Sequence, residues 1–172
     1  GKIDILVNNA ALFADLTQGS FLDIDEAEWD RVMQINTRGV FSCTKAVVPE
    51  MKKNGYGKIV NIASGTVFKG TPMLLHYVSS KGAQIAFTRA LAREVGDDGI
   101  TVNCIAPGLT MSEKVVGVAQ WDAIKDGNTA TRAIKREQMP EDLIGTLVFF
   151  SSSDSDFITG QTLVVDGGSA MH

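Results

Sequence analysis

Four short runs of this chain are apolar at nearly every position, and they constrain the fold more than any other feature. A strand with one face in water alternates apolar and polar residues, whereas a strand covered on both faces is apolar throughout. Longer segments with the period of amphipathic helices separate the runs. Strands that alternate with helices form right-handed parallel βαβ units, so the predicted fold class is α/β, a doubly wound and mostly parallel sheet. The runs are KIDILV (2–7), KIVNIA (58–63), TVNCIA (101–106) and TLVVD (162–166).

Three helices are predicted between these strands. The first begins near Asp25, which has capping-box spacing to Glu28, and Pro49 should strain or end it. The second covers residues 77–95, where small and apolar residues recur at helical spacing. The third begins at Pro140, because proline is favoured in the first turn of a helix.

The length of 172 residues suits one domain with a hydrophobic core, so we predict a single domain over residues 1–172. Within it, residues 109–139 are polar and weakly periodic, which predicts a mobile flap or short helices. A net charge of −4 argues against nucleic acid or an anionic membrane as a partner. Cys43 and Cys104 lack metal-ligand spacing, so we expect two buried free thiols and no metal, with a disulfide as the alternative. With no signal-peptide pattern and no bilayer-spanning apolar run, we predict a cytoplasmic location.

Small or amide residues follow each predicted strand. In a parallel sheet, ligands bind beyond the carboxyl ends of the strands, and small residues let the backbone approach a ligand closely. Any one of these segments can be an ordinary turn, but four at one edge of the sheet predict a binding site. They are NNAA (8–11), SGT (64–66), PGLT (107–110) and GG (167–168).

The sequence HYVSSK (76–81) separates Tyr77 and Lys81 by four residues, a spacing that arises by chance in roughly one chain in ten of this composition. On a helix such residues share a face. An ammonium within about 4–6 Å lowers the pKa of a phenol, whose usual value is near 10. Tyr77 can then take a proton from an alcohol or return it to a carbonyl, and Ser64 at a strand end can donate to the same oxygen.

Six motifs, in order and at matching spacing, resemble those of the short-chain dehydrogenase/reductase family from residue 1 to nearly residue 172. The resemblance implies a Rossmann-like fold and an oxidoreductase that uses NAD or NADP to transfer a hydride to or from a secondary alcohol or ketone. The motifs are Asn8-Asn9-Ala10-Ala11, Asn36 in QINTRG, Ser64 thirteen residues before the tyrosine, Tyr77 with Lys81, Pro107-Gly108, and ITGQTLVVDGG (158–168).

The resemblance also implies roles for residues. Lys81 would bind the nicotinamide ribose, and the backbone carbonyl of Asn36 would hold a water that relays protons to Lys81; an ordinary helix asparagine is the alternative for Asn36. Asn8 and Ala10 would lie near the adenosine side, and Thr110 near the carboxamide. The predicted catalytic residues are Asn36, Ser64, Tyr77 and Lys81, and the predicted cofactor-binding residues are Asn8, Ala10, Tyr77, Lys81, Pro107, Gly108 and Thr110.

Three neighbouring positions add expectations. Ser112 is a further candidate for the edge where Thr110 lies. Ala11 stands where the family has glycine, which costs about 1 kcal/mol if that backbone needs positive φ. His76 is expected to form a wall of the substrate pocket, with a second catalytic base as the alternative.

The Gly-rich turn that binds the pyrophosphate of a dinucleotide is not in this sequence. By resemblance, the chain begins at the fourth strand of the family, is shorter by roughly eighty residues, and lacks the residue that selects NAD or NADP. Residues 2–7 would then form an apolar sheet edge, which another chain would cover unless the fold is rearranged. We expect a fragment of a longer enzyme; the alternative is a truncated remnant that associates but binds no cofactor.

Substrate and assembly are only broadly predicted. Apolar side chains such as Leu74, Val115 and Trp121 favour an apolar, aromatic or acyl substrate, but they could equally pack on one another. The resemblance implies a homo-oligomer, a dimer or tetramer, in which helices 25–53 and 77–95 meet their copies across a two-fold axis. The strand near 163–166 would form a second interface.

Overall fold

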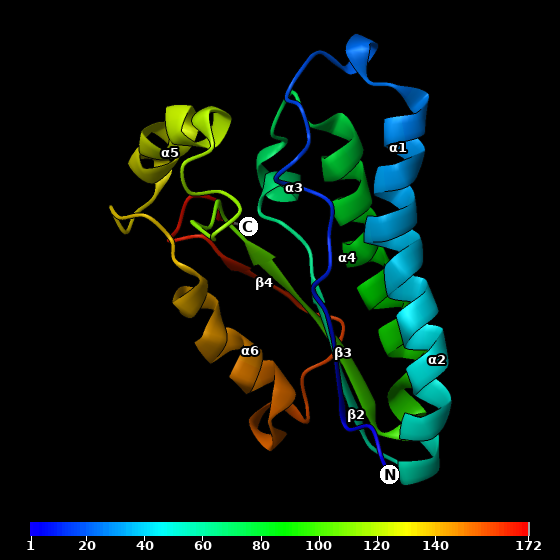
Figure 1. Ribbon diagram of the computed structural model, residues 1–172. Coiled ribbons are helices and arrows are strands. Elements are labelled where there is room, and N and C mark those ends of the chain that lie inside the picture. Colours follow the sequence, from blue (N-terminus) through cyan, green and yellow to red (C-terminus); the bar gives the residue numbers. More distant parts are fainter. Residues whose placement is uncertain (172) are drawn as a thin grey trace.

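The computed structural model describes residues 1–171, and its fold has the predicted α/β class. Four parallel strands form one sheet in the order β1-β2-β3-β4. Helices α2 and α4 cover one face of the sheet and α6 covers the other (Figure 1). The strands are β1 (Ile5–Asn8), β2 (Gly57–Ile62), β3 (Ile100–Pro107) and β4 (Thr162–Val165), and the α-helices are α1 (Glu26–Met33), α2 (Gly39–Asn54), α3 (Thr66–Lys69), α4 (Leu75–Val95), α5 (Ala119–Thr131) and α6 (Ile144–Ser151).

Five shorter helical segments connect these elements. One of them, η2 (Gln34–Arg38), is a π-helical turn that joins α1 to α2 without a break. The other four are 3-10 helices: η1 (Phe21–Asp23), η3 (Gly96–Asp98), η4 (Pro140–Leu143) and η5 (Ser153–Ser155).

The two central strands are buried on both faces, as their continuous apolar sequences predicted. On one face, Ile59 and Val102 pack against Met51 of α2. On the other, Val60 and Ile105 pack against Phe150 of α6. Each such side chain contributes roughly 1.5–3 kcal/mol when it leaves water, so these two clusters attach the helical layers to the sheet.

Strand β1 lies at one edge of the sheet and pairs only with β2 among residues 1–171. Ile5 and Val7 on this strand are 46% and 37% exposed. An open apolar edge favours association with another strand. The expected exposed edge is therefore present, and its coverage by another chain stays a prediction.

The first predicted helix is confirmed, with two differences in detail. Asp25 caps it by accepting a 2.9 Å hydrogen bond from the N–H of Ala27. Glu28 does not complete a capping box, because its carboxylate bonds His76 on α4 instead. Pro49 lies inside α2, which continues to Asn54. Pro49 is on the exposed side of that helix, where water can reach the carbonyl that the missing N–H leaves unbonded.

The remaining predictions of local structure are mostly confirmed. Helix α4 covers the predicted residues 77–95, and Pro140 begins η4, which leads into α6. The segment 109–139 contains α5, so the short-helix alternative holds there. Both cysteines are free thiols, but only Cys104 is buried; the prediction for Cys43 is wrong because it lies on the outer side of α2. Within residues 1–171, no helix is long and apolar enough to cross a membrane.

Candidate active site

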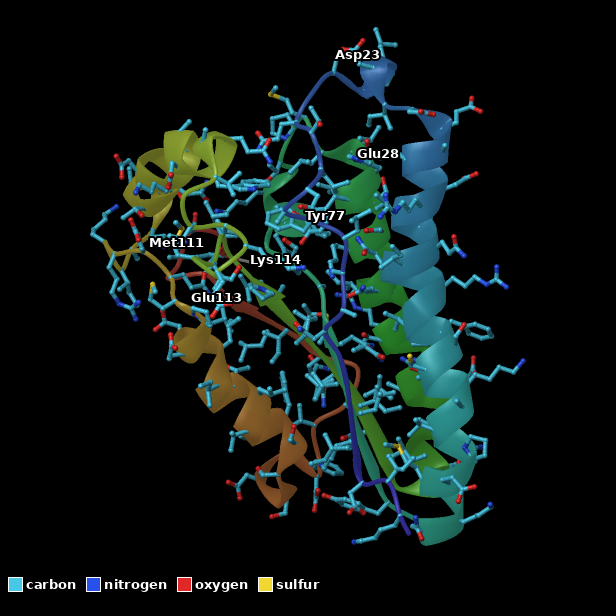
Figure 2. The ribbon with its side chains drawn as sticks, in the orientation of Figure 1. Asp23, Glu28, Tyr77, Met111, Glu113 and Lys114 are labelled. Atoms are coloured by element: carbon cyan, nitrogen blue, oxygen red, sulfur yellow. The ribbon has the colours of Figure 1, made fainter. Side chains whose placement is uncertain are left out.

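The carboxyl ends of the strands open into a cavity of about 670 Å³. Three of the four predicted strand exits line it, through residues 9–11, 64–66 and 107–110. The fourth exit lies elsewhere: Gly167 lines a separate cavity of about 180 Å³. In Figure 1, α3 and α5 gather at this end of the sheet. Figure 2 labels Tyr77, which lies on the first turn of α4 and packs in one cluster with Met111 of the segment that also carries Lys114.

Ser64, Tyr77 and Lys81 converge in this cavity. The Ser64 hydroxyl lies close enough to the Tyr77 phenol to act on its pKa through a hydrogen bond. Ser64 Oγ accepts hydrogen bonds from the Thr66 N–H at 3.3 Å and the Thr66 hydroxyl at 3.0 Å, so its own proton is free to point towards the Tyr77 oxygen. Lys81 Nζ lies 5.8 Å from the centre of the Tyr77 ring and donates to the carbonyl of Ile62 at 2.6 Å. A hydroxyl, a phenol and an ammonium thus face one small volume.

The pKa values of this group differ from the expectation. Burial raises the pKa of Tyr77 to about 12, although the Ser64 hydrogen bond acts in the opposite direction. Burial lowers the pKa of Lys81 to about 8, and the neighbouring Cys104 sulfur partly opposes this change. The expected fall in the pKa of Tyr77 is absent because removing a phenolate from water outweighs the attraction of the ammonium.

Asn36 is completely buried in the π-helical turn and does not line the cavity. Its side-chain amide exchanges two hydrogen bonds with the backbone of Leu12 and donates to Ser80 Oγ at 3.1 Å. Ser80 in turn donates to the carbonyl of Tyr77 at 2.7 Å. The backbone carbonyl of Asn36, expected to hold a water, accepts from Gln84 Nε2 at 2.5 Å. Asn36 therefore ties the first strand exit to α4, and its carbonyl already has one protein donor.

The side chain of Asn8 is not directed into the cavity. Its amide donates to Thr44 Oγ1 at 3.3 Å and to Asn61 Oδ1 at 2.8 Å, inside the core between β1, β2 and α2. Ala10, the other residue predicted for the adenosine side, does line the cavity. Ala11 also lines it and has no positive φ, so the strain considered for an alanine there does not occur.

The predicted residues of the third strand exit all line the cavity: Pro107, Gly108, Thr110 and Ser112. Glycine at position 108 has a packing explanation that needs no ligand. A Cβ atom there would lie 2.8 Å from both the Cβ of Asp166 and Oε1 of Gln138. The loop can therefore pass this close to the C-terminal segment only with glycine.

An aromatic cluster lies beside the cavity, and one of its members, Phe13, was not anticipated from the sequence. The ring of Phe13 lies between those of Tyr77 and Trp121, with centroid distances of 4.8 and 4.5 Å. Leu74, Val115 and Trp121 pack in this cluster and also line the cavity, so their packing on one another is confirmed and an apolar substrate stays a prediction. His76 is not a pocket wall: it is buried, its Nε2 lies 2.8 Å from Glu28 Oε1, and it does not line the cavity.

The charged residues that line the cavity are Lys69, Lys81 and Lys114, and no carboxylate is among the described lining residues. This arrangement suits an anionic ligand. A second cavity of about 690 Å³ lies at the amino ends of β2 and β3. Its buried Lys58 is already neutralised by Asp156, with Nζ 2.7 Å from Oδ1. Of these two cavities, the one with Tyr77 is therefore the stronger candidate for a functional site.

Comparison with known proteins agrees with this geometry. The sequence model described as enoyl-(acyl carrier protein) reductase matches residues 1–170. The chain belongs to the short-chain dehydrogenase/reductase family. It is 39% identical to dehydrogenase/reductase SDR family member 4 of Bos taurus over 172 residues, which are 100% of this chain and 61% of that protein.

Other members of this oxidoreductase family are similarly close. A 3-oxoacyl-(acyl-carrier-protein) reductase of Staphylococcus epidermidis is 36% identical over 171 residues, 99% of this chain and 68% of that protein. The crystal structure of a gluconate 5-dehydrogenase from Burkholderia cenocepacia, in complex with NADP and tartrate, superposes with a TM-score of 0.89 at 33% identity. The match covers 98% of this chain and 65% of that one. The chain therefore spans about two thirds of the length of these relatives.

Proposed function

We propose that this chain carries the catalytic part of an NAD- or NADP-dependent oxidoreductase that interconverts a secondary alcohol and a ketone. The observation that carries the proposal is the convergence of Ser64, Tyr77 and Lys81 in one cavity. The family membership agrees with it, and the gluconate 5-dehydrogenase of Burkholderia cenocepacia binds NADP. The oxidoreductase class follows from the family, whereas the cofactor and the substrate are the proposed parts.

The lining residues fit the nicotinamide end of a dinucleotide. The cavity is lined by lysines without carboxylates, and the small residues Ala10 and Ala11 allow close approach of a ligand. Lys81 Nζ uses one of its three protons on Ile62, so it can also donate to a ribose hydroxyl. Pro107, Gly108 and Thr110 would lie along the nicotinamide ring. A nicotinamide bound here would supply the hydride acceptor for oxidation of the carbinol carbon and the hydride donor for reduction of the carbonyl carbon.

Three side chains would handle the proton and the oxygen of the substrate. The oxygen of Tyr77 takes the hydroxyl proton during oxidation and returns it during reduction. Because Thr66 supplies both hydrogen bonds that Ser64 Oγ accepts, the Ser64 proton can turn from the Tyr77 oxygen to the substrate oxygen as charge develops there. Phe13 and Trp121 exclude water from this side of the cavity and favour an apolar substituent on the substrate.

The wider predictions about the protein stay part of this proposal. We place the enzyme in the cytoplasm, with a small-molecule substrate and no nucleic acid or membrane partner. We also propose a homo-oligomer, a dimer or tetramer, because apolar side chains remain exposed on the outer helices and edge strands. Examples are Phe41 on α2, Val148 on α6 and Leu163 on β4.

The test combines nucleotide binding with hydride transfer. Trp121 fluorescence should be quenched by NADH or NADPH, since this indole lines the cavity. Tyr77→Phe should retain that binding and reduce the hydride-transfer rate about 10²–10⁴-fold. Tyr56→Phe is the matched control, because Tyr56 lies at the opposite end of the sheet near Lys58. If neither nucleotide quenches at millimolar concentration, the proposal fails for this chain and the cofactor-incompetent remnant is favoured.

A further inference from the structure

Gln84 lies on α4 one turn after Lys81 and is only 1% exposed. Its Nε2 donates to the backbone carbonyl of Asn36 at 2.5 Å, while its Oε1 is buried with no hydrogen-bond partner among residues 1–171. A carbonyl oxygen can only accept, so this bond fixes which end of the amide is nitrogen. A buried acceptor without a donor is strongly disfavoured. The Gln84 oxygen therefore requires a hydrogen-bond donor that the described side chains do not supply.

Helix geometry indicates which turn of α4 this oxygen covers. Side chains on an α-helix tilt towards its N-terminus, so the amide of Gln84 lies over the turn that contains Ser80 and Lys81. Asn36 supports this placement independently: its carbonyl accepts from Gln84 and its side-chain amide donates to Ser80 Oγ at 3.1 Å. The ammonium of Lys81 uses one proton on the carbonyl of Ile62. Two further donors thus remain on the same helix face.

The backbone around Gln84 is also fixed. Its carbonyl accepts from Thr88 Oγ1 at 2.9 Å, and Thr88 Oγ1 accepts from Asn61 Nδ2 at 2.8 Å. Asn61 continues the chain of hydrogen bonds to Asn8 on β1. Gln84 is therefore attached to η2 through its side chain and to the sheet through its backbone, which limits how far its amide can move.

We propose that Gln84 is a positioning residue for Lys81: its Oε1 accepts a hydrogen bond from a buried water, and that water accepts one from Lys81 Nζ. The contact is a property of the free chain. Only its use, to hold the ammonium where the proton of Tyr77 is exchanged, rests on the proposed function.

Few other groups compete for the Lys81 ammonium. Tyr77 faces it from the same helix and Cys104 faces it from β3. From β2 it receives the carbonyl of Ile62. A change in the acceptor that Gln84 provides should therefore appear directly in the titration of Lys81.

The experiment measures the pKa of Lys81 by NMR of ¹³C-labelled lysine, assigned with Lys81→Met. Gln84→Leu removes the acceptor and should lower the pKa of Lys81 by roughly half a unit or more. Gln84→Glu keeps an oxygen acceptor and adds negative charge, so it should raise that pKa. Gln138→Leu is the matched control and should leave it unchanged. Gln138 is also buried, also donates Nε2 to a backbone carbonyl and also has an unpartnered Oε1, but it lies behind the loop of Gly108.

If Gln84 is purely structural, both substitutions should lower the urea midpoint and leave the pKa of Lys81 unchanged. That result would overturn the proposal. A measurement on the unsubstituted chain covers the case in which the variants do not fold. The Gln84 side-chain N–H groups should show a nuclear Overhauser effect to a long-lived buried water, and its absence would also overturn the proposal. Neither readout needs a nucleotide, so failure of the proposed enzymatic function is seen separately, as missing cofactor binding.

Discussion

Replacing Lys81 by methionine should stabilise the folded protein at neutral pH, even though it removes a proposed catalytic residue. Lys81 is 2% exposed, and burial lowers its pKa from 10.5 to about 8. Each pKa unit corresponds to about 1.4 kcal/mol, so holding this ammonium in the core costs roughly 3 kcal/mol. The variant also loses the hydrogen bond to the carbonyl of Ile62, worth about 1 kcal/mol. We therefore expect a net gain of about 2 kcal/mol in the free energy of unfolding near pH 7.

The pH dependence gives this prediction its sign. Well below pH 8, Lys81 is protonated in both the folded and the unfolded state, and the full penalty is present. As the pH rises through the folded-state pKa of about 8, the folded protein releases this proton while the unfolded chain keeps it up to about 10.5. The unfolding free energy of the unsubstituted protein should therefore rise by about 1 kcal/mol between pH 7 and pH 9 from this group alone. Lys81→Met should lack that rise.

Urea unfolding followed by tryptophan fluorescence at several pH values measures both effects. The series should stop near pH 9. Burial raises the pKa of the Cys104 thiol to about 11 from its ordinary value of 9.0, so at higher pH this thiol titrates in the unfolded state before the folded state. Lys58→Met is the control, since Lys58 is equally buried but paired with Asp156 at 2.7 Å and its loss should destabilise. Parallel pH curves for Lys81→Met and the unsubstituted protein would refute the reasoning.

Three further predictions concern the core, the first strand exit and the sheet edge. Asn61→Leu removes two buried hydrogen bonds of 2.8 Å and should cost about 2 kcal/mol in urea unfolding, whereas Thr101→Val should cost little because Thr101 Oγ1 has no partner among the described residues. Ala11→Gly should leave nucleotide affinity unchanged in fluorescence titration, because φ at Ala11 is not positive; a clear gain would contradict this. The chain should associate through the exposed edge of β1, and light scattering measures this. Ile5→Lys with Val7→Lys should reduce the association, whereas a monodisperse unsubstituted monomer would contradict the prediction.

The sequence was sufficient for the elements of the fold because each has its own periodic signal. The apolar runs that became β2 and β3 are buried on both faces, and Asp25 begins the first helix as its residue type suggested. Pro49 and Cys43 were misjudged for one shared reason. Both lie on the side of α2 that faces solvent, and the orientation of a helix about its axis depends on what it packs against.

The partners of buried polar groups could not be predicted in this way. Asn8 bonds Asn61, His76 bonds Glu28, and Gln84 bonds Asn36. Each pair is about fifty residues apart in sequence, so no local pattern joins its members. Asn8 and His76 therefore turned away from the cavity that motif position suggested, while Gln84 acquired a hydrogen bond to the Asn36 carbonyl that no motif indicated.

For Tyr77 and Lys81 as well, the spacing in the sequence predicted where the side chains lie but not how they are protonated. The four-residue spacing brings both side chains to one helix face, but burial sets their pKa values, near 12 for Tyr77 and near 8 for Lys81. A phenol with so high a pKa is a poor base at neutral pH, and Lys81, 5.8 Å from the ring centre, does not offset the desolvation. The proposed reaction therefore needs a further positive charge beside the phenol, which an oxidised nicotinamide bound in this cavity would supply. On this reasoning, the reactive state of Tyr77 belongs to the complex with cofactor and not to the free chain.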